Sequence, residues 1–158
     1  MKIKYLLLLI AGLFLFVASG CSSVKKYTST PDKNFSVRSK IEDKNVDAEV
    51  YILGGLKECE GKGDLPALGR VELQQGETEF GLAPDKLYLL KIYFNTKNFF
   101  GDEIANTLQR ALIIPKPGNK YRINLNYAEK MYDISIFEMD TKSSVGRRIP
   151  IVPYNTCK

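Results

Sequence analysis

Few side chains of this chain suit acid–base or nucleophilic chemistry. There is no histidine, which excludes Ser-His-Asp and Cys-His catalysis and histidine metal ligands. Adjacent acids occur at Glu42-Asp43 and Asp102-Glu103, but neighbours on a strand point to opposite faces and do not form an acid–base pair. A serine–lysine nucleophile at Ser143-Ser144 stays open as a minor alternative, since basic residues lie nearby but no motif supports it. We therefore predict no catalytic residue, no metal site and no cofactor.

The remaining reactive side chains are the cysteines Cys21, Cys59 and Cys157. Cys59 and Cys157 lack the Cys-x-x-Cys spacing and the additional ligands that a metal site needs. Two cysteines of an exported domain commonly form a disulfide, and we predict one between them, with a metal-binding or reactive thiol role as the alternative. Because Cys157 is the penultimate residue, this bond would fasten the C-terminal tail to the segment around Cys59.

Cys21 ends a segment with the layout of a signal peptide. A basic stretch, residues 1–4, precedes an apolar run over residues 5–17 and then three small residues. The run is too short for a membrane span, which needs about 20 residues. The site before the cysteine resembles the bacterial lipobox: Val17-Ala18-Ser19-Gly20-Cys21. An ordinary secretory signal with a chance cysteine, or a retained membrane helix, remains as an alternative.

The resemblance to bacterial lipoproteins implies how the chain is processed and where it resides. Signal peptidase II would remove residues 1–20, and Cys21 would carry a diacylglycerol thioether and often an acylated amino group, for example a palmitate. Two or more acyl chains hold a protein stably at a membrane. In lipoproteins of Gram-negative bacteria, a serine such as Ser22 after the cysteine favours the periplasmic side of the outer membrane.

Length and composition fit one globular domain behind a linker. The chain has 158 residues, of which 44% are hydrophobic and 26% charged. We predict a lipidated flexible tether over residues 21–34 and a single domain over residues 35–158. Removing Lys2 and Lys4 with the signal peptide lowers the formal net charge from +5 to +3. The basic residues are spread among acidic ones, so we expect no nucleic-acid binding.

Alternating hydrophobicity predicts an all-β domain of seven or eight short strands. The strongest pattern spans residues 86–95, where an apolar second face indicates a central strand. Residues 120–127 and 131–138 alternate about a tight turn and predict a hairpin. Weaker patterns predict strands over residues 35–41, 48–52, 70–74, 111–114 and 148–152. Residues 103–109 suit either a short helix capped by Asp102 or an irregular crossover.

The C-terminal half is similar to small transthyretin-like or immunoglobulin-like lipoprotein domains. The resemblance is carried by the alternating hairpin and by the stretch before it: Pro117-Gly118-Asn119-Lys120-Tyr121-Arg122-Ile123. It implies an antiparallel β-sandwich. Tyrosines on predicted strands fit a half-buried sheet surface, whereas an exposed cluster of them would mark a binding face. These tyrosines are Tyr51, Tyr88, Tyr93, Tyr121, Tyr127 and Tyr132.

Taken together, the two resemblances imply a non-catalytic, lipid-anchored module of the cell envelope. It would bind or hold another envelope component, and we expect an envelope protein as partner besides the membrane. An immunity or inhibitor protein against a periplasmic toxin or enzyme is the alternative. A cell-envelope hydrolase is the least favoured class, since no histidine and no catalytic motif is present.

Overall fold

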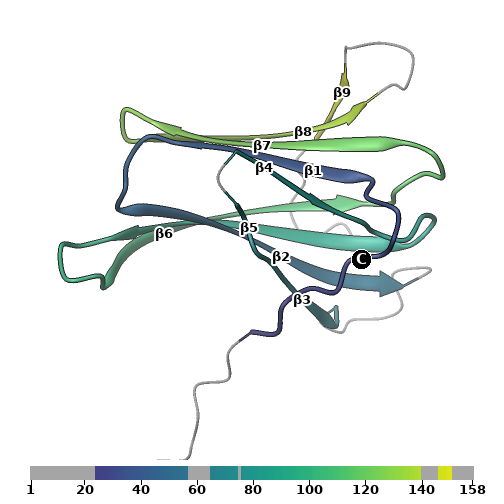
Figure 1. The fold of residues 1–158 in the computed structure, drawn as a ribbon, viewed down its shortest axis with the longest axis horizontal. Helices are drawn as coiled ribbons and strands as arrows, with labels where there is room; N and C mark the ends of the chain where they lie inside the picture. Colours follow the sequence, from purple (N-terminus) through teal and green to yellow (C-terminus); the bar gives the residue numbers. More distant parts are fainter. Residues whose placement is uncertain (1–23, 57–64, 75, 140–145, 151–158) are drawn as a thin grey trace, which may run out of the picture.

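The computed structural model describes residues 24–56, 65–74, 76–139 and 146–150, and these form nine β-strands and no helix (Figure 1). The all-β prediction is confirmed, with nine strands in place of seven or eight. The strands are β1 (Phe35–Ile41), β2 (Val46–Leu56), β3 (Ala67–Val71), β4 (Gly76–Phe80), β5 (Leu87–Lys97), β6 (Glu103–Ile113), β7 (Lys120–Ala128), β8 (Met131–Met139) and β9 (Gly146–Ile149).

The strands form two sheets that lie one above the other in Figure 1. One sheet has the order β4-β1-β7-β8-β9 and the other the order β3-β2-β5-β6. Neighbouring strands pair antiparallel except β1 and β7, which run parallel with Phe35 opposite Tyr121. The prediction of a purely antiparallel arrangement is wrong at this pair. Alternation along a strand gives its period and not the direction of its neighbour.

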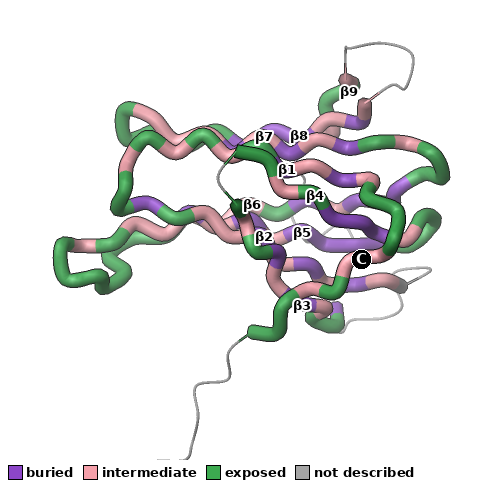
Figure 2. The backbone as a smooth tube through the Cα atoms, viewed as in Figure 1, coloured by how far each residue is buried: buried purple, intermediate pink, exposed green. Residues whose placement is uncertain are grey.

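A single hydrophobic core joins the two sheets. On β5, the alternating residues Tyr88, Leu90, Ile92 and Phe94 are buried in one cluster with residues of β1, β7 and β8. Figure 2 shows the buried stretches along both sheets. Leu89, on the second face of β5, is also buried, and β5 lies between β2 and β6. The prediction of a central strand whose second face is partly covered is therefore confirmed.

The predicted hairpin is confirmed as β7 and β8. Ala128 pairs with Met131, so Glu129 and Lys130 alone form the turn. Their φ angles are 52° and 63°, which is the left-handed geometry that a two-residue hairpin turn of type I′ requires. Asparagine and glycine usually occupy these positions, so this turn holds two side chains in a conformation that they adopt reluctantly.

Residues 103–109 form neither of the two predicted alternatives, the short helix or the irregular crossover, because β6 occupies this stretch. β6 pairs with β5 from Tyr88↔Ile113 to Lys97↔Glu103. Asp102 lies in the turn before β6 and caps no helix. Hydrogen bonding to the edge of β5 outweighs the local preference for a helix after Asp102. Tertiary context commonly overrides secondary-structure propensity in this way. β4 escaped prediction because only Phe80 of its five residues is buried, so it shows no apolar alternation.

The chain before β1 also packs on the domain. Tyr27 donates its amide hydrogen to the Arg70 carbonyl oxygen and its hydroxyl to the Gly81 carbonyl oxygen, both at 2.8 Å. The Asn34 side chain exchanges two hydrogen bonds of 2.9 Å with the Leu82 backbone. The tether predicted over residues 21–34 therefore lies against the sheets from about residue 25 onward. Cys21, Cys59 and Cys157 lie outside the described residues, so lipidation and the disulfide stay predictions.

Candidate functional site

The acid pairs singled out in the sequence lie in and beside turns. Asp43 accepts a hydrogen bond of 2.9 Å from the Asn45 amide between β1 and β2, and exposed Glu103 accepts one of 2.7 Å from the Asn106 side chain. Both acids thus bond to amides of their own turn or strand. Ser143-Ser144 lies outside the described residues. In the described ranges, no three histidine, cysteine, aspartate or glutamate side chains are placed to hold a metal ion.

Glu138 is the centre of a tightly bonded polar cluster. The Lys116 ammonium lies 3.0 Å from its carboxylate, and Arg147 pairs with the other carboxylate oxygen. The Asn119 side chain donates a hydrogen bond of 2.6 Å, and the Tyr121 hydroxyl lies 3.5 Å away. These partners come from the β6–β7 connection, β7 and β9, so the carboxylate ties together three separate pieces of the chain.

The electrostatics of Glu138 point to a structural role. Burial alone would raise the pKa of the carboxyl, but hydrogen bonds from Lys116, Arg147 and Asn119 outweigh burial and lower the pKa to about 2. A carboxylate that is ionised at every physiological pH and surrounded by donors is a poor general acid or base. The burial of Glu138 could have been inferred from the sequence, because Glu138 continues the apolar face of Ile134 and Ile136 on β8.

The strand tyrosines do not gather into an exposed cluster. Tyr88 and Tyr121 are buried in the core, and each hydroxyl accepts a backbone hydrogen bond, from Ala83 and Lys116 respectively. Half-buried Tyr51 and Tyr93 pack edge to face, with ring centroids 5.3 Å apart, and Tyr127 is also half-buried. The explanation of these residues as sheet packing is therefore confirmed for the buried pair, and only Tyr132 of the six is exposed.

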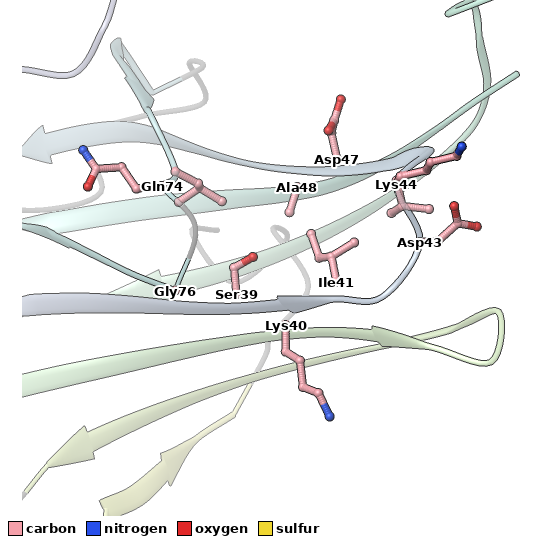
Figure 3. A pocket seen from close by; sticks show the side chains of 11 residues that line it. Ser39, Lys40, Ile41, Asp43, Lys44, Asp47, Ala48, Gln74 and Gly76 are labelled. Atoms are coloured by element: carbon pink, nitrogen blue, oxygen red, sulfur yellow. The ribbon is translucent and has the colours of Figure 1, made fainter. Parts of the chain in front are cut away.

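A pocket of about 650 Å³ opens between β1 and β2 (Figure 3). The side chains of Ser39, Ile41 and Ala48 point into it, whereas Lys40 and Asp47 point away. The groups that point inward from the two strands thus carry no titratable side chain, and the charged lining residues Asp43 and Lys44 come from the turn between β1 and β2.

Apolar side chains are exposed at one end of the two sheets. This apolar end consists of the residues that begin β6 and β8 and the turn between β5 and β6: Phe99, Phe100, Ile104, Met131 and Tyr132. In Figure 1 the turn between β5 and β6 and the turn between β7 and β8 both lie at the left of the molecule. Five of the seven large hydrophobic residues exposed in the described part of the chain are found here. Concentration of this kind marks an interaction surface, whereas scattered exposed hydrophobics do not.

Phe99 and Phe100 project furthest, and we call them the aromatic tip. Phe99 is 96% exposed and Phe100 is 86% exposed, and their rings lie edge to face with centroids 5.7 Å apart. Sequence reasoning did not single them out, because residues 96–107 lacked a clear period. Asn98 and Gly101 do mark a turn, and this turn lies at the end of the hairpin, beyond the core.

The turn that carries the aromatic tip is held by its own hydrogen bonds. The Asn98 side-chain oxygen accepts from the amides of Phe100 and Asp102, each at 2.9 Å. The Asn98 amide donates to the Asp102 carbonyl oxygen at 2.9 Å, and the Asn98 carbonyl oxygen accepts from the Gly101 amide at 3.0 Å. This is the Asx-turn chemistry that favours asparagine in tight turns. Hydrogen bonds within the turn therefore fix the backbone that carries the two exposed rings.

No family model matches the chain, and neither a curated protein nor a solved structure matches it at a significant level. In the stretches that the structure describes, no helix is long and apolar enough to cross a membrane.

Proposed function

We propose that this chain is a lipid-anchored, non-catalytic binding module of the bacterial cell envelope. The observation that carries the binding role is the aromatic tip, where Phe99 and Phe100 are almost fully exposed. Two large rings in water are unfavourable in proportion to their apolar area. Such exposure is typical of a surface that is covered in the working state.

Lipid anchorage is proposed from the lipobox. Cys21 would carry the acyl chains, and the domain would sit on the periplasmic side of the outer membrane, with an envelope protein as a further partner. Because residues from about 25 onward pack on the sheets, only a few residues would separate the lipid from the domain. The module would therefore work close to the membrane surface.

We also propose that the domain is a β-sandwich of the transthyretin-like kind. The core shared by two sheets supports this proposal. An immunoglobulin arrangement would place the first two strands side by side in one sheet, whereas β1 and β2 belong to different sheets here.

A second candidate function is inhibition of, or immunity against, a periplasmic enzyme or toxin. The observation that favours it is the exposure of the aromatic tip at the end of a hairpin, because exposed aromatic side chains can fill a pocket on a partner. No particular target follows from the described residues.

An affinity purification from gently solubilised envelopes tests the binding role. The wild-type lipoprotein is compared with a Phe99→Ser, Phe100→Ser double variant and with a control, Ile114→Ser, which changes an exposed residue just beyond β6. We expect the double variant alone to recover less of an envelope component, whether a protein or lipid. Equal recovery of every component by all three proteins would contradict a binding role for the tip.

A further inference from the structure

We infer that the aromatic tip enters the lipid bilayer and holds the domain against the membrane at a second point. The inference rests on the proposed lipid anchorage, because the anchor keeps a bilayer within reach. It names the occupant of the tip as the acyl-chain region beneath the headgroups.

The size of the tip favours a bilayer over a protein pocket. A standard protein–protein interface buries about 800 Å² on each partner, whereas two phenylalanine side chains supply roughly 300–500 Å². Phe99 and Phe100 lie at the end of the hairpin of β5 and β6, which extends beyond the rest of the two sheets (Figure 1). A fluid bilayer closes around a projecting group without a preformed cavity, so the small contact suffices when an anchor already holds the protein nearby.

Three backbone amides of the turn already have hydrogen-bond partners, which suits an environment with little water. Polar backbone groups that lose water without a partner oppose insertion. Here the amides of Phe100, Gly101 and Asp102 all donate within the turn. The Asn98 side-chain nitrogen also donates to the Asp102 carboxylate at 3.1 Å. Shallow insertion would therefore bury the rings while these bonds stay intact.

The charges beside the tip indicate insertion without electrostatic attraction. Lys97 pairs with Asp47, and Asp102 and Glu103 follow the tip on its other side. Membrane binding through anionic headgroups relies on clusters of four to eight basic residues, and the residues that flank the tip in the described turn form no such cluster. We therefore expect insertion to be independent of anionic lipid and of salt.

The start of the described chain and the tip can reach one membrane surface. Val24 lies three residues after Cys21, a distance of at most roughly 11 Å in an extended chain. Lys26 forms a β-bridge with Arg70 of β3. Arg70 and Lys91 of β5 both pair with Tyr51 of β2, so they lie at the same level across the sheet. Lys97, which precedes the tip, lies about 20 Å from Lys91 along β5. Both points lie on the side of the four-stranded sheet in Figure 1.

The absence of tryptophan from the chain allows a direct test. A single Phe100→Trp variant of the full-length lipoprotein is reconstituted into vesicles of phosphatidylethanolamine and phosphatidylglycerol, with and without lipids brominated on their acyl chains. We expect the emission to shift to shorter wavelength and to be quenched by the brominated lipids. The quenching should be the same in vesicles of phosphatidylcholine alone and in high salt.

The matched control is Arg148→Trp, an exposed residue of β9 on the other sheet and at the other end of the strands. Its emission should remain that of an indole in water. Flotation of the same vesicles reports anchorage separately. If the Phe100→Trp variant floats but its indole is not quenched, the insertion is overturned and the anchorage stands. The same conclusion follows if the emission shift appears only when envelope protein is added. A protein that does not float overturns both.

Discussion

Glu138 occupies a position on β8 that continues the apolar face of Ile134 and Ile136, yet it is a carboxylate held by Lys116, Arg147 and Asn119. Its folded pKa of about 2 lies below the ordinary 4.5. A group with a depressed folded pKa stabilises the fold above its unfolded pKa, and that contribution is lost as the pH falls through the folded value. Glu138 should thus support the fold above about pH 4.5 and cease to do so as the pH falls to about 2.

The substitution Glu138→Gln tests this role. It removes the charge that Lys116 and Arg147 neutralise but keeps an acceptor for Asn119. We expect the free energy of unfolding at neutral pH to fall by about 1–3 kcal/mol, as measured by urea denaturation. Between pH 4.5 and 2.5 the variant should lose less stability than the wild type.

Glu72 supplies the control, because it pairs with Lys26 on the open surface. Glu72→Gln should leave the acid transition close to that of the wild type, since exposed ion pairs contribute little. If Glu138→Gln also matched the wild type across the whole range, the structural role of the Glu138 cluster would be refuted.

At the level of elements, the turn between β7 and β8 offers a stabilising change. Lys130 has a φ of 63°, which glycine adopts without steric cost. We expect Lys130→Gly to raise the free energy of unfolding by about 0.5–1 kcal/mol. The neighbouring change Ala128→Gly, inside β7, should lower it by about the same amount. Equal effects of the two glycines would contradict the type I′ turn.

Strands buried on a regular period could be predicted from the sequence, and weaker patterns also located β1 and parts of β2 and β3, whereas β4 and the start of β6 could not be predicted. β5, β7 and β8 alternate or are apolar on both faces, so their existence and the hairpin followed from the pattern. The first four residues of β6 are exposed, and only the edge of β5 decides their conformation. The parallel partner of β1 depends on how the chain crosses between sheets, which local periodicity does not encode.

The candidate site was only partly accessible from the sequence. Exclusion of histidine chemistry needed composition alone. The Glu138 cluster joins residues from the β6–β7 connection to β9, so only the folded arrangement brings its charges together. Exposure of Phe99 and Phe100 depends on the length of the hairpin beyond the core, which no residue pattern specifies.

At the scale of the whole molecule, the predicted bond between Cys59 and Cys157 would close a loop of about 100 residues, for which chain-entropy models give ~4–5 kcal/mol. We expect neither cysteine to react with a thiol probe in the denatured, unreduced protein and both to react after reduction. Labelling of both without reduction would contradict the disulfide. The double variant Cys59→Ser, Cys157→Ser should unfold at lower denaturant concentration than the wild type.

We propose that a lipid on Cys21 holds this binding module at the membrane. Intact-mass spectrometry of the protein purified from cell membranes is the sharpest test of this proposal. We expect a chain that begins at Cys21 and carries the added mass of a diacylglycerol, with or without a further acyl group, and no such species from a Cys21→Ala variant. An unmodified mass, or a chain that begins at any other residue, would contradict the claim.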